Sequence, residues 1–131
     1  MGFLMINDKV VDKNKTKKLV EHYLYLYSNI SAKLLASSQE KAVEFLNSEV
    51  TFLGSSIKVY QFVDLMDKSI SALAENQRCL IVEKYVKNNG NDFDYIVKEN
   101  LKLAERTYYR IKLNALLSLA QNLNALVFND N

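Results

Sequence analysis

Residues 104–112 read AERTYYRIK, and their spacing separates two sides of one helix. At 100° per residue, Tyr108 and Ile111 share one side, which Ala115 continues. The opposite side is a strip at spacings of three and four residues, formed by Arg106, Tyr109, Arg110 and Leu113. The helical pattern then continues without a break to about residue 128. We therefore expect a long C-terminal helix that is charged on its outer side at the start.

The segments that precede this helix predict a helix-turn-helix. Residues 75–87 carry apolar residues at helical spacing, and Asn-Asn-Gly-Asn at 88–91 supplies a glycine end followed by an Asn cap. A short helix over residues 92–100 and a connection over 101–103 lead into the long helix. A short helix, a tight turn and a long helix in this order are typical of the helix-turn-helix.

The rest of the chain also indicates helix, so the fold class is all-α. The chain has no proline and three glycines, and apolar spacing predicts a helix over residues 14–36. Ser37 and Glu40 form a capping box for a second helix, and Ser56 caps a third. Residues 47–56 break the periodicity, with a short extended piece at 51–53. We therefore divide the chain into an N-terminal helical region, 1–55, for oligomer or partner contacts, and a helix-turn-helix domain, 56–131.

The outer strip of the long helix has the chemistry of a DNA-reading surface. Arg106 and Arg110 can each donate two hydrogen bonds to guanine in the major groove, and Tyr109 suits a phosphate or a thymine methyl group. The lysines around the strip suit phosphate contacts: Lys98, Lys102 and Lys112. The alternative is an ordinary solvated face, which most charged helical surfaces are.

The same stretch resembles the end of the ArpU-like phage transcriptional regulators, which are similar to region 4 of sigma-70 factors. The resemblance covers residues 73–123 and is carried by AERTYYRIK with Ala115 and Ala120. It implies a helix-turn-helix of the sigma-70 region 4 type that controls late phage or mobile-element genes in a bacterial host. Operator DNA and host RNA polymerase are the implied partners. The implied DNA-facing residues are Arg106, Thr107, Tyr109, Arg110 and Lys112, with Tyr108 and Ile111 inside.

Residues 113–129 contain no charged residue, and Leu116, Ala120, Leu123 and Val127 follow one another along one side of the helix. This apolar side needs cover. A second copy of the chain would provide it and would place two reading helices on DNA, so we favour a homodimer. The alternative is that the N-terminal helix folds back over this side.

No enzyme class is indicated. His22 is the only histidine, and no Ser, Cys or carboxylate pattern near it defines a triad or a metal site. The chain also lacks a glycine-rich phosphate loop. We expect neither a catalytic site nor a cofactor nor a metal.

Composition limits the other possibilities. A net charge of +2 is too small to imply nucleic-acid binding by itself. A single cysteine, Cys79, is expected to be a small buried hydrophobe in a reducing cytosol, and no segment suggests export or a membrane span. We expect a cytoplasmic protein.

Three functions therefore stay open. The first is a sequence-specific transcriptional regulator, acting as an activator, and the second is a DNA-packaging component similar to a small terminase subunit. The third is a helical adaptor that binds another protein through the uncharged C-terminal face and does not bind DNA.

Overall fold

The computed structural model describes residues 5–6, 9–87 and 92–129, and these are mostly helical. The helices are α1 (Lys13–Ala36), α2 (Gln39–Leu46), α3 (Val59–Ser71), α4 (Glu75–Ile81), the π-helix η1 (Val82–Val86), α5 (Asp94–Asn100) and α6 (Glu105–Leu123). Two small antiparallel sheets accompany them, one formed by β1 (Met5–Ile6) and β2 (Lys9–Val10) and the other by β3 (Glu49–Phe52) and β4 (Ser55–Lys58). The all-α expectation is thus confirmed in its coarse form.

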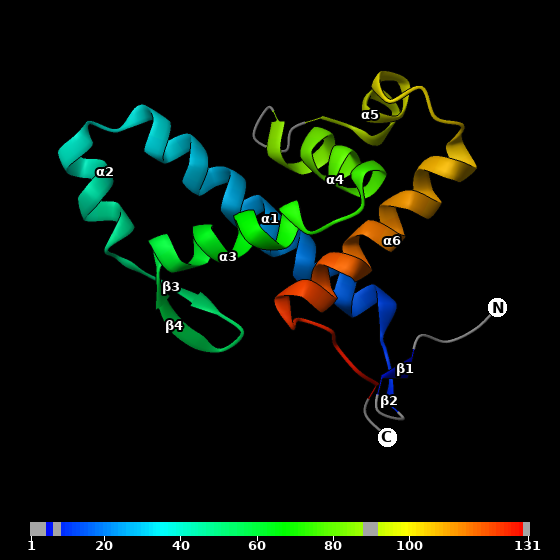
Figure 1. The fold of residues 1–131 in the computed structure, drawn as a ribbon, viewed down its shortest axis with the longest axis horizontal. Helices are drawn as coiled ribbons and strands as arrows, with labels where there is room; N and C mark the ends of the chain where they lie inside the picture. The colour runs from blue at the N-terminus through cyan, green and yellow to red at the C-terminus, as the bar shows by residue number, and fades with distance from the viewer. Residues whose placement is uncertain (1–4, 7–8, 88–91, 130–131) are drawn as a thin grey trace.

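Helix α1 is the long central element of the fold (Figure 1). It lies between α2 with the β3–β4 hairpin at one end and the α4, α5 and α6 group at the other. The main core is built from α1, α3 and α6, with Leu24, Phe62 and Leu116 completely buried. This core takes residues from both of the regions predicted from the sequence, which therefore share one interior. The boundary between residues 55 and 56 remains a prediction.

A second, smaller core holds α4, α5 and α6 together. It consists of one residue from α4, one from α5 and two from α6: Leu80, Val97, Tyr108 and Ile111. Leu101 and Leu103, in the connection between α5 and α6, pack against this cluster. The apolar inner side predicted for α6 is therefore confirmed, and it fixes the angle at which α6 leaves the turn.

The predicted helix 14–36 is confirmed within one residue, but the next two helix starts are wrong. Ser38 rather than Ser37 caps α2, accepting a hydrogen bond from the Lys41 amide, because Ser37 ends α1 by donating to the Lys33 carbonyl. Ser56 does not cap α3, because it pairs with Thr51 in the β3–β4 hairpin. The extended piece expected at 51–53 is therefore confirmed as part of a longer strand pair.

The hairpin turn uses two residues of positive φ, Leu53 at 50° and Gly54 at 80°. This pair of left-handed residues suits the right-handed twist of two strands joined by a short loop. The Tyr23 hydroxyl accepts a hydrogen bond of 2.9 Å from the Leu53 amide and so ties the turn to α1.

Two other predicted features differ from the structure. Cys79 is exposed rather than buried, because Leu80 and Ile81 occupy the inward positions of α4. Helix α6 ends at Leu123 rather than near residue 128, because Asn124 adopts φ 57° and turns the chain back toward α1. The Asp12 amide then donates to the Val127 carbonyl at 2.7 Å, and Val11 pairs with Phe128. The Asn-Gly turn predicted at 88–91 lies outside the described residues.

Candidate nucleic-acid interface

Helices α5 and α6 are joined by a tight turn of four residues, 101–104. Lys102 adopts a left-handed conformation, with φ 56°. The Leu103 amide donates to the Lys98 carbonyl and the Lys102 amide to the Glu99 carbonyl, which is the Schellman pattern of a helix end. Glycine usually occupies this left-handed position, so a lysine here costs backbone energy.

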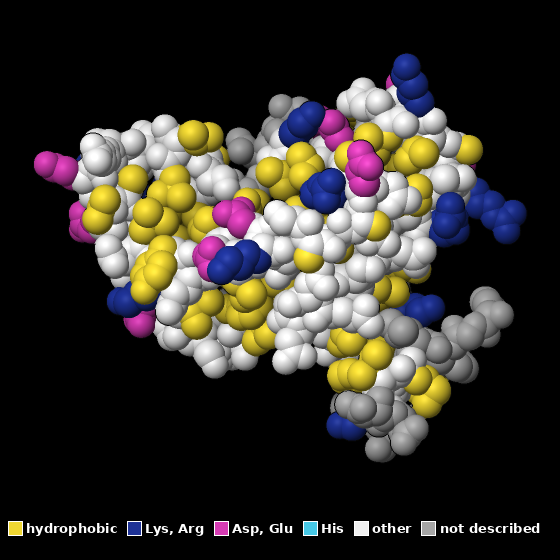
Figure 2. Space-filling model, in the orientation of Figure 1, with side chains coloured by type: hydrophobic (Ala, Val, Ile, Leu, Met, Phe, Trp, Pro, Cys, Tyr) yellow, Lys and Arg dark blue, Asp and Glu magenta, His cyan; other side chains and the backbone are white. Residues whose placement is uncertain are grey.

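The outer strip at the start of α6 is exposed as expected. Arg106, Tyr109 and Arg110 are all open to solvent, while Tyr108 and Ile111 of the same turns are buried. Figure 2 shows Lys and Arg side chains that project from the edge of the molecule beside the first turns of α6. Neither arginine forms a hydrogen bond or ion pair with another residue in the part of the chain that the structure describes. The two guanidinium groups are therefore free to meet a partner.

Three residues around the strip, Lys98, Lys102 and Thr107, differ in their exposure to solvent. Lys102 is exposed, and Thr107 is half-buried. Lys98 is also half-buried, with its Nζ 3.9 Å from a Glu105 carboxylate oxygen. The structure therefore leaves Lys102 more available for phosphate contacts than Lys98.

Lys112 is the main correction to the predicted site. Only 7% of the residue is exposed, and its Nζ donates to both carboxylate oxygens of Asp94, at 3.0 and 3.1 Å. Its side chain therefore points toward α5 rather than outward with Arg106 and Arg110. The expectation that Lys112 lies on the DNA-facing surface is wrong, because a charge partner eighteen residues away draws it inward.

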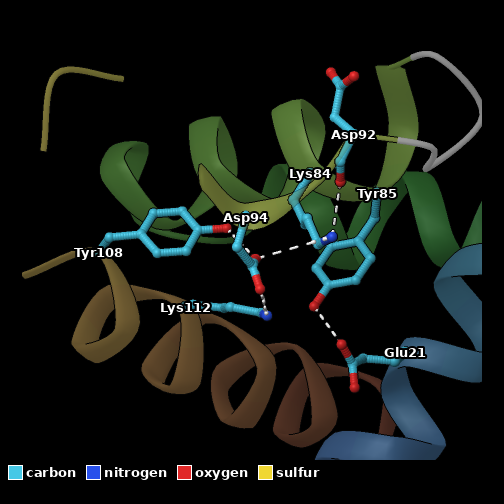
Figure 3. Close-up of polar contacts among 7 residues, drawn as sticks. All are labelled: Glu21, Lys84, Tyr85, Asp92, Asp94, Tyr108 and Lys112. Carbon is cyan, nitrogen blue, oxygen red and sulfur yellow. Dashed lines mark hydrogen bonds and ion pairs between the residues drawn. The ribbon is translucent and has the colours of Figure 1, made fainter. Parts of the chain in front are cut away.

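Asp94, the first residue of α5, is the centre of a polar cluster (Figure 3). The Tyr108 hydroxyl donates to its Oδ1 at 2.6 Å, and the Lys84 Nζ lies 3.9 Å from the same oxygen. Lys84 also donates to the Asp92 carbonyl at 2.8 Å. Together with Lys112, these contacts tie α5 to both η1 and α6. Nothing near Asp94 in the sequence indicates these partners, which only the fold brings together.

The charge state of this cluster is well defined. Burial acts to raise the pKa of Asp94, but the hydrogen bonds from Tyr108 and Lys112 and the two nearby ammonium groups outweigh it, so its pKa is lowered. Burial and the hydrogen bond to Asp94 raise the pKa of Tyr108. The aspartate is therefore ionised and the tyrosine neutral at neutral pH.

A second polar contact connects η1 to α1. The Tyr85 hydroxyl donates to a Glu21 carboxylate oxygen at 2.6 Å. Burial, and to a smaller extent this hydrogen bond, raises the pKa of Tyr85. Tyr25 stands edge-on to the Tyr85 ring, with centroids 5.6 Å apart. Helix α1 thus contacts η1 through both aromatic and polar side chains. Through η1 it supports the group of helices that carries the exposed arginines.

The apolar side of α6 is covered within the chain. Leu116 and Ala120 are completely buried and Leu123 is 3% exposed, in the core shared with α1 and α3. One of the two reasons for favouring a homodimer, the need for cover, therefore does not hold, because the N-terminal helix provides that cover. The dimer itself stays a prediction.

Other classes of site have little support among the described residues. No group of three or more His, Cys, Asp or Glu side chains in that part of the chain is arranged to hold a metal ion, and His22 is exposed. No helix there is both long and apolar enough for a membrane span. Two open hollows of about 420 and 300 Å³ lie beside α2 and beside α4, respectively. Their lining side chains form no recognisable catalytic set.

Comparisons with protein-family models, with curated proteins and with solved structures find no match for this chain. The resemblance to the ArpU-like regulators therefore remains an expectation that rests on residues 104–112, Ala115 and Ala120.

Proposed function

We propose that the chain binds double-stranded DNA through α6 and acts as a sequence-specific transcriptional regulator in a bacterial cytoplasm. In this proposal α5, the turn at 101–104 and α6 form a helix-turn-helix similar to region 4 of sigma-70 factors. The first turns of α6 enter the major groove.

One observation carries the proposal: two arginines that have no partner among the described residues, and an exposed tyrosine, project from the same helix turns that Tyr108 and Ile111 anchor in the core. A recognition helix needs both properties, because its base contacts are specific only if the helix is held rigidly. The free guanidinium groups supply the donors that read guanine, and Lys102 is placed to contact a flanking phosphate.

The test is a selection of bound duplexes from a random pool, repeated at two salt concentrations. We expect an enriched sequence motif with the native chain and its loss in an Arg106→Ala/Arg110→Ala variant. Each arginine removed should weaken specific binding by about tenfold. A matched control is Lys41→Ala/Lys68→Ala, which removes two exposed positive charges on α2 and α3 and should bind as the native chain does.

Two results would contradict the proposal. Salt-sensitive binding without any enriched motif would favour a packaging protein or simple charge attraction. No binding to any duplex by the native chain would favour the adaptor, which should tolerate the arginine substitutions.

A further inference from the structure

The strongest charge concentration in the chain lies at the start of α1, far from the arginines in sequence. Residues 9–18 contain five lysines, Lys9, Lys13, Lys15, Lys17 and Lys18, and a single acidic residue, Asp12. The whole chain has a net charge of only +2, so the remainder is net acidic. We call these five residues the lysine cluster. Such clustering indicates an anionic partner more clearly than the total charge does.

Contacts among the described residues do not explain the lysine cluster. Within the described residues, none of its ammonium groups forms an ion pair. Lys9 lies over the Phe128 ring at 6.0 Å from the centroid, and Asp12 uses its carboxylate to cap α1. Cations near a helix N-terminus oppose the helix dipole, and the first turn of α1 contains no acidic residue to offset its lysines. The cluster therefore costs the fold energy that a partner outside the chain can recover.

The fold brings the lysine cluster to the far end of α6 from the arginines. The Thr16 hydroxyl accepts a hydrogen bond of 2.9 Å from the Val127 amide, which fixes the start of α1 beside the segment that follows α6. From Arg106 to its last residue, Leu123, α6 is about 26 Å long, and the two positive groups lie at its opposite ends. Positive side chains appear along one edge of Figure 2, beside the first turns of α6 and again near the start of α1. One turn of duplex, about 34 Å, covers this distance.

We propose that the lysine cluster is a second DNA contact, which binds the phosphate backbone about one helical turn away from the bases that α6 reads. This inference rests on the proposed function. It gives the N-terminal region a role in affinity rather than in specificity, because lysines on a phosphate backbone carry no sequence information.

The surroundings of the lysine cluster favour a nucleic acid over a membrane surface. Lys15 and Lys18 are exposed opposite the buried side of α1, which carries Thr16 and Val20. On α1, the first exposed large hydrophobic side chain is Tyr25. A helix that lies on a membrane needs exposed apolar side chains between its lysines, and α1 has none between Lys13 and Lys18.

The test measures how DNA affinity changes with salt. Fluorescence anisotropy with a labelled duplex of about 30 base pairs, between roughly 50 and 200 mM salt, gives the slope of log affinity against log salt. We expect Lys15→Gln/Lys18→Gln to lower this slope by about 2, because each lost phosphate contact removes about 0.9. The enriched motif should stay the same. The charge-matched control, Lys41→Gln/Lys68→Gln, should keep the native slope, and circular dichroism checks that each variant folds.

The outcomes separate this inference from the proposed function. If Arg106→Ala/Arg110→Ala abolishes specific binding while Lys15→Gln/Lys18→Gln keeps the native slope, the function stands and the second contact is wrong. If the native chain binds no duplex, both fail. If the lysine variant loses binding to phosphatidylserine vesicles but keeps the native DNA slope, the cluster serves a membrane and the inference is overturned.

Discussion

The Lys112 ammonium group lies between the two carboxylate oxygens of Asp94, at 3.0 and 3.1 Å, and is almost completely shielded from solvent. This pair joins the first turn of α5 to the second turn of α6. Tyr108, one turn earlier on α6, donates a hydrogen bond to the same carboxylate. One ionised aspartate therefore helps to hold α6 against α5, beside the apolar cluster of the same helices.

Replacement of this aspartate should destabilise the fold markedly. Asp94→Asn leaves the buried Lys112 ammonium without its counter-charge, and we expect the free energy of unfolding to fall by about 2–3 kcal/mol. Urea unfolding followed by circular dichroism measures the change. Asp64→Asn is the control, because it breaks an exposed ion pair with Lys68 and should cost about 0.5 kcal/mol or less. Equal losses in the two variants would show that the Asp94 pair has no special role.

The same pair predicts a dependence on pH. Because the pKa of Asp94 is lowered in the folded chain, its stabilising contribution is complete above the unfolded value of about 3.9 and is lost as pH falls through the folded value. The deficit of Asp94→Asn relative to the native chain should therefore be constant near neutral pH and shrink below about pH 4. Unfolding in urea at a series of pH values measures it. A deficit that stays constant into strong acid would mean that folding does not lower the pKa of Asp94.

The turn between α5 and α6 allows stability and binding to be separated. Lys102→Gly removes the left-handed strain of a residue with a side chain at φ 56°, and we expect it to stabilise the fold by about 0.5–1 kcal/mol. Lys102→Ala removes the same charge but keeps the strain, so it should not stabilise. If Lys102 contacts a phosphate, both variants should lower the salt slope of DNA binding equally, by about 0.9. Thermal unfolding and anisotropy titrations measure the two effects, and stabilisation by alanine as well as glycine would refute the strain argument.

Sequence reasoning was accurate where local spacing decides the structure. The helix at 14–36 and the buried side of α6 at Tyr108 and Ile111 follow from contacts among residues three and four apart, which the sequence displays directly. The start of α2 was wrong by one residue because Ser37 and Glu40 have the spacing of a capping box, although the adjacent Ser38 can cap a helix equally well. Only the end of α1 determines which of the two serines is free.

The remaining errors come from contacts between distant segments. Lys112 looks like a surface residue in the sequence, since nothing near it indicates that Asp94 will lie within bonding distance. The apolar side around Leu116 gave no information on whether α1 or a second chain covers it. The lysine cluster is visible in the sequence, but its position at the end of α6 depends on the contact between Thr16 and Val127.

The last prediction concerns how α6 reads bases rather than whether it binds. Arg110→Lys keeps the positive charge but replaces a planar group with two parallel donors by a single ammonium group. If Arg110 bonds the O6 and N7 atoms of a guanine, the variant should keep the native salt slope. It should also lose about 1–3 kcal/mol of discrimination at one base pair of the motif. Selection from a random duplex pool, followed by competition between the best sequence and its single-base variants, measures this discrimination. The same substitution at the exposed Arg106 is the companion experiment, and it should relax a different base pair because the two side chains lie one helical turn apart. A motif that is unchanged in both variants would mean that the two arginines contact only phosphates, and another part of the chain would have to carry the specificity.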